Sequence, residues 1–270
     1  MNKVAIIILN KSNNELLFDC LTSIKEKTSF KNYHIYLGDT GSTKEEVAGI
    51  KAFIKKNFAE QKNVTYIQFD YYNFAKNNNV IIREYVKDEN LLLFCNNDIK
   101  LIDDCISEAV KMYDRNPDIT GTIGFKLIFK NETLQHAGQM LILHENNQFA
   151  HITHRGLKEN KDLYSGRERV IGNTMALMLT PKSLYLQLGG LNESYLDCFE
   201  DVEYNLNCII GGRHNIYIGD RAAWHYESQT RDVDPNKMKK LNMDANQRLI
   251  PFIHKHIIPI VKTGLARTIP

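Results

Sequence analysis

Short apolar runs alternate with longer amphipathic stretches over the first part of the chain. The apolar runs, which predict strands, are residues 4–9, 34–38, 64–69 and 91–95. The stretches with apolar residues at helical spacing, which predict helices, are residues 16–24, 45–58 and 80–86. Strands that alternate with helices in this way form βαβ units. The pattern predicts an α/β fold whose Rossmann-like, mostly parallel sheet is flanked by helices and joined by right-handed connections.

The apolar run at residues 91–95 ends abruptly in Asn96, Asn97 and Asp98. Because this run has no polar alternation, it predicts a strand buried on both faces. In open parallel sheets, ligands bind beyond the carboxyl ends of the strands. A carboxylate at that edge can hold Mg²⁺ or Mn²⁺ against substrate phosphates. The alternative is a plain Asn-Asn-Asp turn, since these side chains readily bond to their own backbone.

Two further polar segments follow predicted strands. Asp39 begins a Gly-containing segment directly after residues 34–38, and the Asn-rich residues 72–79 follow the run at 64–69. Asp39 can hydrogen-bond a base or ribose, and the Asn-rich segment can offer amides and a helix N-terminus to phosphate. A turn and a helix cap are the simpler alternatives. The coincidence of both segments with Asp98 at one edge of the sheet favours nucleotide binding.

The second half of the chain departs from strict alternation. A helix is predicted over residues 102–113, followed by a strand at 121–129, after which polarity rises. Further strands are predicted at 171–181, 215–219 and 222–226, and further helices at 183–188 and 202–210. Glu200 and Asp201 lie near the start of the last helix, where the helix dipole favours negative charge. Helix capping is therefore an alternative to any chemical role for these two acids.

Composition narrows the class of protein. The 270 residues carry a formal net charge of +2, and charges of both signs are interspersed. Nucleic-acid binders usually show a basic stripe, so we expect no nucleic-acid partner. The run at residues 4–9 is too short for a signal peptide, and no segment approaches the roughly 20 apolar residues that span a bilayer. We therefore expect a cytoplasmic protein, attached at most to the inner face of the membrane.

Cysteine and histidine usage gives no sign of a structural metal or of disulfides. The five cysteines are odd in number and lack CxxC spacing, which is typical of reduced thiols in a cytosolic protein. Four histidines, His136, His144, His151 and His154, are close in sequence, but their spacing matches no standard zinc pattern. We expect no structural zinc site.

Several short motifs occur in an order and spacing that match a known family. They are Asn10 after the first strand, Asp39-Thr40-Gly41-Ser42 in the place of a D-x-G-S motif, Asn73-Phe74-Ala75 in the place of G-F-A, Asn96-Asn97-Asp98 in the place of a D-x-D motif, residues 189–193, residues 200–203 and His225. On these motifs the chain resembles the inverting glycosyltransferases of family 2, which have the GT-A fold. Residues 134–138 (LQHAG) and 154–156 (HRG) are similar to a branch that builds bacterial capsule, O-antigen or other surface polysaccharides.

The resemblance implies a set of roles. The expected contacts to a nucleotide-sugar donor, UDP- or dTDP-linked, are Asn10, Asp39, Asn73, Lys76 and Asn97. The expected ligands of a divalent cation, Mn²⁺ or Mg²⁺, are Asp98 and His225, and the expected catalytic residues are Asp201, as the base, and Glu200. The acceptor would be a hydroxyl of a glycan or of a lipid-linked sugar. A bound cation and a catalytic base both suit sugar transfer. The cation stabilises the charge on the leaving diphosphate, and the base takes the proton of the acceptor hydroxyl.

The chain departs from the family pattern at three of these positions. Asn96 replaces the first acid of the D-x-D motif, which leaves the metal fewer charged ligands. Asn73 replaces the usual glycine, and Lys76 stands where a small residue is common, so Lys76 itself is a candidate donor contact. A non-catalytic carbohydrate- or nucleotide-binding protein of the same fold is the alternative that Asn96 keeps open. A nucleotidyltransferase is less consistent, because residues 10–14 contain no glycine.

The resemblance also sets the expected domain boundaries. Residues 1–230 form the GT-A catalytic domain, with a nucleotide-sugar-binding half at 1–125 and an acceptor half at 126–230. Residues 231–270 form a helical or irregular C-terminal extension that mixes apolar and basic residues. Such a segment can lie on an anionic membrane surface, pack onto the catalytic domain or contact a partner in a homodimer. Pro251 and Pro259 argue against one long helix in it.

Overall fold

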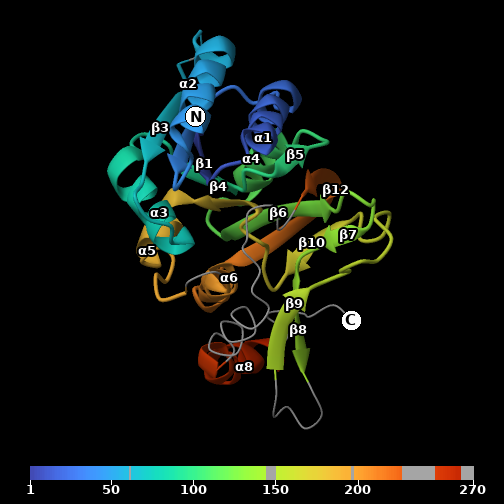
Figure 1. Ribbon diagram of the computed structural model, residues 1–270. Helices are drawn as coiled ribbons and strands as arrows, with labels where there is room; N and C mark the ends of the chain where they lie inside the picture. Colours follow the sequence, from blue (N-terminus) through green and yellow to red (C-terminus); the bar gives the residue numbers. More distant parts are fainter. Residues whose placement is uncertain (61, 144–149, 196–197, 227–246, 263–270) are drawn as a thin grey trace.

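A mixed sheet runs through the protein, with helices on both faces (Figure 1). The computed structural model describes residues 1–60, 62–143, 150–195, 198–226 and 247–262. In spatial order the strands of the main path are β10 (Arg167–Val170), β12 (His214–His225), β6 (Thr120–Ile128), β11 (Leu177–Pro181), β4 (Leu91–Cys95), β1 (Val4–Asn10), β2 (Tyr33–Asp39) and β3 (Val64–Gln68). All of these except β10 and β11 run in the same direction. The predicted mostly parallel α/β fold is confirmed.

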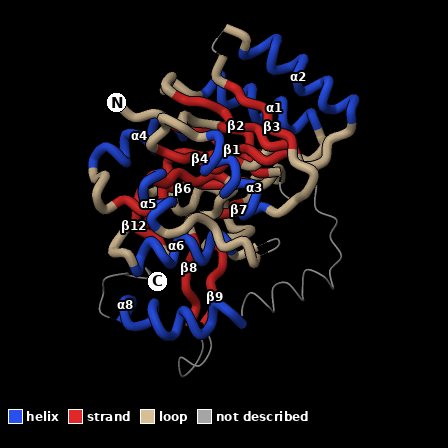
Figure 2. The backbone as a smooth tube through the Cα atoms, turned by 90° about the vertical axis from the view of Figure 1, so that its left-hand side faces the viewer, coloured by secondary structure: helices blue, strands red, loops and turns tan. Residues whose placement is uncertain are grey.

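Strand β1 shows why the sheet is covered on both faces. Val4, Ile6 and Ile8 point into one apolar cluster, while Ala5 and Ile7 point into a second cluster on the opposite face. The first cluster is closed by α1 (Asn14–Lys27), α2 (Lys44–Phe58) and α4 (Cys105–Arg115), and the second by α3 (Phe74–Val80), α5 (Lys182–Gln187) and α6 (Glu200–Ile210). Helices therefore lie on both sides of the strands (Figure 2). A strand whose two faces are both buried needs apolar residues at every position, as the unbroken runs predicted.

Four short strands extend this framework. They are β5 (Ile99–Leu101), which pairs with β12, β7 (Leu134–His136), which pairs with β6, and a separate hairpin of β8 (Gln139–Leu143) and β9 (Ala150–His154). None of the four was predicted. β5 and β7 are only three residues long, which is too short for a periodic signal, and β8 and β9 lie where the polarity of the chain rises. In Figure 1 the β8–β9 hairpin projects from the side of the sheet that carries β10 and β12.

Several predicted boundaries are wrong. The helix predicted at 102–113 begins at Cys105, because Ile99–Leu101 form β5 and the Asp104 side chain caps the helix by accepting from Ser107 N at 3.1 Å. The two strands predicted at 215–219 and 222–226 are one strand, β12, with an irregularity in its pairing to β6. The strand predicted at 171–181 forms only from Leu177.

The helix predicted at residues 80–86 also begins earlier than expected. Helix α3 starts at Phe74 and runs directly into a π-helical turn, η1 (Ile81–Tyr85). The Asn73 side chain accepts from Lys76 N at 2.8 Å and caps this helix. Asparagines at 77–79 have low helix propensity, which is why the sequence pattern missed them. Tertiary hydrogen bonds decide their helical conformation, as described below.

The described part of the C-terminal extension packs onto the domain. Residues 247–262 are helical, with a π-helical turn η3 (Ile253–Ile257) before α8 (Ile258–Lys262). Leu249, Ile253 and Ile257 are buried in a third apolar cluster with Val202 and Leu206 of α6. Of the three alternatives for the tail, packing onto the domain is therefore observed for these residues.

The prolines do not interrupt this helical segment, contrary to the prediction. A proline removes one backbone N–H and its ring clashes with the carbonyl four residues before it. The wider π-helical turn just before Pro259 relieves that crowding. Among the residues that the structure describes, none of the helices combines the length and the apolar character required to cross a membrane.

Candidate active site

The polar ends of three strands meet at one edge of the sheet. Strand β1 pairs with β2 on one side and with β4 on the other, so the order reverses there and leaves a crevice at the carboxyl ends. Asn10, Asp39 and Asn97 lie at these ends. Asn97 Nδ2 donates to Asn10 Oδ1 at 2.8 Å, and Asn10 Nδ2 lies 3.5 Å from Asp39 Oδ2. The structure thus brings three predicted donor contacts into one hydrogen-bonded row.

Asp39 also shapes its own loop. Its Oδ1 accepts from the backbone N–H groups of Gly41 at 3.1 Å and Ser42 at 2.9 Å, which is the turn that the sequence offered as an alternative. Ser42 Oγ in turn accepts from Asn10 Nδ2 at 3.2 Å. Asp39 is 1% exposed. Its Oδ2 atom makes the long, 3.5 Å contact with Asn10 Nδ2. The turn and a nucleotide contact are therefore compatible, with Oδ1 used for the first and Oδ2 left for the second.

Asp98 and His225 face each other at the same edge. Strand β5 holds them there, because it follows Asp98 directly and pairs antiparallel with β12 so that Ile99 lies opposite His225. Asp98 Oδ1 lies 3.3 Å from His225 Nε2, and Asn96 Nδ2 also lies 3.3 Å from that nitrogen. Both Asp98 and His225 are more than nine-tenths buried. The two predicted metal ligands, which are far apart in the sequence, are thus in contact.

The atoms that face each other at this contact, His225 Nε2 and Asp98 Oδ1, suit a cation that is also bound by a substrate. His225 Nδ1 lies 2.7 Å from Gln135 Oε1, so the proton of a neutral imidazole is held on Nδ1 and the lone pair of Nε2 faces Asp98. A lone pair and a carboxylate that point at one spot fit a cation between them. Within the described ranges, no group of three or more His, Cys, Asp and Glu side chains is placed to hold a metal. Magnesium-type sites with one or two protein ligands are completed by water and substrate phosphates.

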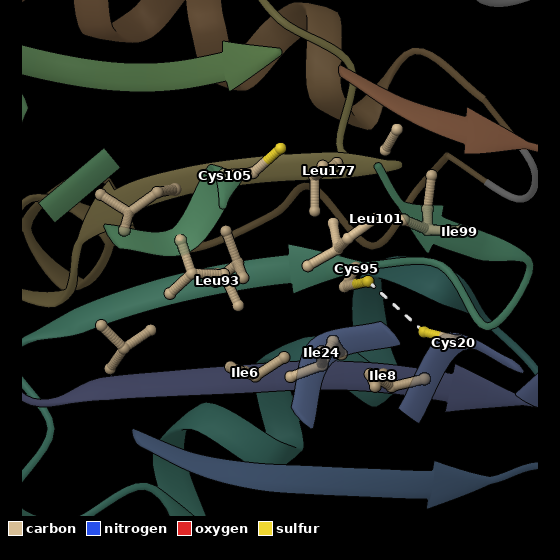
Figure 3. Close-up of a cluster of buried hydrophobic side chains, with 14 of the residues drawn as sticks. Ile6, Ile8, Cys20, Ile24, Leu93, Cys95, Ile99, Leu101, Cys105 and Leu177 are labelled. Atoms are coloured by element: carbon tan, nitrogen blue, oxygen red, sulfur yellow. Dashed lines mark hydrogen bonds between the residues drawn. The ribbon is translucent and has the colours of Figure 1, made fainter. Parts of the chain in front are cut away.

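Two buried thiols lie under the Asn96 turn. Cys20 Sγ of α1 and Cys95 Sγ at the end of β4 are 3.8 Å apart, and both are within 3.6 Å of the Asn96 carbonyl oxygen (Figure 3). The hydrogen bond with the Cys95 thiol, together with burial, raises the pKa of Cys20 well above its usual value. All five cysteines of the chain are free. The pair therefore packs within the buried core next to the Asn96 turn.

Asp201 and Glu200 differ in accessibility, although they are adjacent at the start of α6. Phe199, with a φ of 74°, occupies the N-cap without a side-chain hydrogen bond, so Asp201 is not the cap. Asp201 is partly exposed, whereas Glu200 is 9% exposed. The Oδ2 atom of Asp201 accepts long hydrogen bonds from Gln139 Nε2 and Met175 N, both at 3.4 Å. Burial of the carboxylate raises the pKa of Asp201, and the nearby charge of His154 opposes that rise.

The Asn-rich helix α3 has a structural role. Asn79 is fully buried and ties α3 to the loop at 189–193: its Oδ1 accepts from Tyr185 Oη at 2.6 Å and Leu191 N at 3.0 Å, and its Nδ2 donates to Leu191 O at 2.9 Å. Gly190 has a φ of 82°, and a Cβ there would lie 2.4 Å from Asn79 Oδ1, so only glycine fits. The expectation that residues 77–79 present amides to phosphate is therefore wrong for Asn79.

At the start of that helix, Asn73 and Lys76 remain near the surface. The Asn73 side chain is used as the cap, as described above. Lys76 is exposed, and its Nζ lies 4.7 Å from the centre of the Tyr71 ring. Of the two, Lys76 is the one whose polar group is placed to meet a ligand.

The sequence motifs at 134–138 and 154–156 contribute residues to which no role was assigned. Gln135 contacts His225, as described above, and the adjacent His136 is buried against His154, with ring centres 4.7 Å apart. Burial and the nearby charge of His154 hold the pKa of His136 well below its usual value. Gln139 is paired with His154 across the β8–β9 hairpin and contacts Asp201. The motifs were visible in the sequence, but only the fold shows that their side chains contact His225 and Asp201. His144 lies outside the described residues.

Comparison with known proteins identifies the family. The model of the family described as glycosyl transferase family 2 matches residues 3–179. This chain belongs to that family. The match includes the carboxyl ends of β1, β2 and β4 and therefore most of the row described above.

Two curated relatives match most of this family 2 chain. The O-antigen biosynthesis protein RfbC of Myxococcus xanthus is 23% identical over 234 residues, which are 86% of the chain and 18% of the relative. An uncharacterised protein, y4gI, of Sinorhizobium fredii is 24% identical over 242 residues, which are 88% of the chain and 26% of the relative. The chain thus spans about a quarter or less of either relative.

Solved structures show the same fold at low sequence identity. GalNAc-T7, solved with UDP, GalNAc and Mn²⁺, is similar over 100% of the chain and 59% of its own length, with a TM-score of 0.68 and 13% identity. The fragment 1–349 of TarS from S. aureus, solved with UDP-GlcNAc, is similar over 92% of the chain and 65% of its own length, with a TM-score of 0.61 and 13% identity. These neighbours are glycosyltransferases of the GT-A type, and the expected GT-A fold is confirmed.

Proposed function

We propose that this chain is an inverting, metal-dependent glycosyltransferase that moves a sugar from a UDP- or dTDP-linked donor to a hydroxyl of a glycan or lipid-linked acceptor. The observation that carries the proposal is the contact of Asp98 with His225 at the point where the strand order of the sheet reverses. Asp201, a partly exposed residue whose carboxylate is buried, supplies the second group that the reaction needs.

The donor is held by the row at the strand ends. Asp39 Oδ2 accepts from the base or ribose, while Asn10 and Asn97 fix its position through their own hydrogen bonds. The exposed ammonium of Lys76 pairs with the diphosphate. UDP and UDP-GlcNAc in solved structures of the neighbour TarS support a uridine nucleotide over other bases.

Asp98 and His225, with Asn96 beside them, hold the cation. Bound Mn²⁺ or Mg²⁺ supplies a Lewis acid that stabilises negative charge on the leaving diphosphate. The Mn²⁺ in the GalNAc-T7 structure supports this choice of ion. Because Asn96 contributes no charge, we expect weaker metal affinity than for a site with two carboxylates.

Asp201 removes the proton of the acceptor hydroxyl as that oxygen attacks the sugar. Its raised pKa suits the task, because a base is most effective when its pKa approaches the working pH. One displacement inverts the configuration of the sugar, so no carboxylate nucleophile is needed. Glu200, the adjacent acid in the first turn of α6, is buried and is assigned a supporting role.

The likeness to RfbC supports an acceptor in the synthesis of a bacterial surface polysaccharide. The apolar side chains of the described tail are used in packing onto α6. Contact with a membrane that carries a lipid-linked acceptor would therefore rest on exposed basic residues such as Arg248 and Lys255.

A panel of nucleotide sugars tests the proposal. Thermal unfolding is measured with each donor, with Mn²⁺ and again after EDTA, and nucleotide release is measured alongside. A ligand at about 100 times its Kd should stabilise the fold by about 2.7 kcal/mol. We expect the UDP- or dTDP-linked donors to act only with Mn²⁺, and His225→Ala to lose this effect.

His214→Ala, the same substitution at the other end of β12, is the control and should keep the effect. Equal donor binding in EDTA for the unchanged chain would remove the metal from the proposal. A lack of nucleotide release with every donor and with added glycan acceptors would contradict transferase activity.

A further inference from the structure

The second residue of β7 reaches into the proposed metal site. Gln135 is 2% exposed, and its Oε1 lies 2.7 Å from His225 Nδ1. The strand is fixed by pairing with β6, in which His136 lies opposite Leu127 and Leu134 opposite Ile128. Gln135 itself lies at an irregularity in this pairing, between the two paired positions, and its amide approaches His225 from within the strand.

We propose that Gln135 is a positioning residue for the cation: it fixes the ring of His225 and presents Nε2 to the metal. The inference rests on the proposed metal dependence. An amide oxygen only accepts, so this hydrogen bond places the proton of the neutral imidazole on Nδ1. The lone pair of Nε2 then faces Asp98 Oδ1, 3.3 Å away. Gln135 does not touch the cation or the donor and acts only through His225.

The geometry around Nε2 supports this assignment over a packing role for His225. Asn96 Nδ2 lies 3.3 Å from Nε2, and an amide N–H can donate only to a nitrogen that carries no proton. Gln135 and Asn96 therefore favour the same tautomer, and with that tautomer the lone pair of Nε2 and the carboxylate of Asp98 are two acceptors that a cation between them would satisfy. Partners that fix the tautomer and orientation of a ligating histidine typically contribute 10-fold to 100-fold to metal affinity.

Three substitutions in β7 test the inference. Gln135→Met keeps the length of the side chain and removes the acceptor, so we expect the Kd for Mn²⁺ in the presence of UDP to rise by about 10-fold to 100-fold. Gln135→Glu restores an acceptor at the same place and should bring the Kd back to the value of the unchanged chain or below it. Leu134→Met puts the same new side chain into the neighbouring buried position, and the Kd should not change. Electron paramagnetic resonance of free Mn²⁺ gives each Kd without requiring activity.

A second measurement needs no variant of Gln135. The ¹⁵N shifts of the imidazole, assigned with His225→Ala, should show the Nδ1–H tautomer in the metal-free chain at neutral or higher pH.

A Gln135→Met chain that is folded and binds Mn²⁺ as tightly as the unchanged chain would overturn the inference, and so would the Nε2–H tautomer. If the unchanged chain with UDP binds no Mn²⁺, the proposed metal dependence itself is wrong. The Kd of the unchanged chain therefore distinguishes that failure from a failure of the role of Gln135.

Discussion

Replacement of Asp201 by Asn separates a catalytic role of this residue from a structural one. Asn has nearly the same shape, and its Oδ1 can still accept from Gln139 Nε2 and Met175 N, whose contacts are long at 3.4 Å. The substitution removes the capacity to take a proton together with the negative charge, and it replaces one of the two oxygens that accept from Met175, Val202 and Thr174 by an NH2 group. We expect transfer to fall by about 100-fold to 10,000-fold. At 1.36 kcal/mol per tenfold, this corresponds to about 2.7–5.4 kcal/mol in activation free energy.

The stability of the same variant should not fall with its activity. The folded state raises the pKa of Asp201, which means that it disfavours the carboxylate relative to the unfolded chain. For such an acid, stability is greatest at low pH and is lost as pH rises through the folded pKa. A neutral Asn avoids that loss and gives up about 0.3–1 kcal/mol of interaction with the dipole of α6. The Tm at neutral pH should therefore stay close to that of the unchanged chain.

The assay measures the transfer rate, the donor affinity and the Tm for Asp201→Asn and for Glu200→Gln. Glu200 is the matched control because it is the adjacent acid in the same helical turn, yet it is 9% exposed and less able to reach an acceptor. We expect a modest effect for Glu200→Gln and unchanged donor affinity for both variants. Near-normal transfer by Asp201→Asn, or a larger loss in the Glu200 variant, would refute the assignment of the base.

Other predictions concern the surroundings of the site and the packing of the chain. His154→Gln removes a charge that lowers the pKa of Asp201, so the fall of kcat/KM on the acidic side should begin at higher pH than in the unchanged chain. If the exposed ammonium of Lys76 binds the diphosphate as proposed, Lys76→Ala should raise KM for the donor more than it lowers kcat in steady-state kinetics, because that contact lies outside the reacting centre. Asn79→Leu should lower the unfolding free energy in urea by about 1–3 kcal/mol for each buried group left without a partner. Ile253→Ala should cost about 2–5 kcal/mol in the same assay if the tail is part of the domain, and a negligible loss would contradict that packing.

The local sequence determined most of the central sheet. The run at residues 91–95 forms a strand with every residue buried, and the N-terminal helices lie where the helical spacing placed them. These signals are local, because burial on both faces or on one stripe requires a fixed period of apolar residues. The same signals failed where other contacts outweigh propensity, as in α3, whose last asparagine, Asn79, is held by Tyr185 and Leu191.

The candidate site depended on the sequence and the fold in different ways. The residue types at the strand ends were visible in the sequence, and their order matched the family, so Asn10, Asp39, Asn97 and Asp98 could be singled out. Their distances, the orientation of His225 by Gln135 and the greater exposure of Asp201 over Glu200 could not. They depend on pairings such as β5 with β12 and on contacts such as that of Gln135 with His225, which join segments distant in sequence. Local periodicity specifies which face of an element is buried, but the pairing and register of distant segments follow from packing the whole core, and only the tertiary structure decides them.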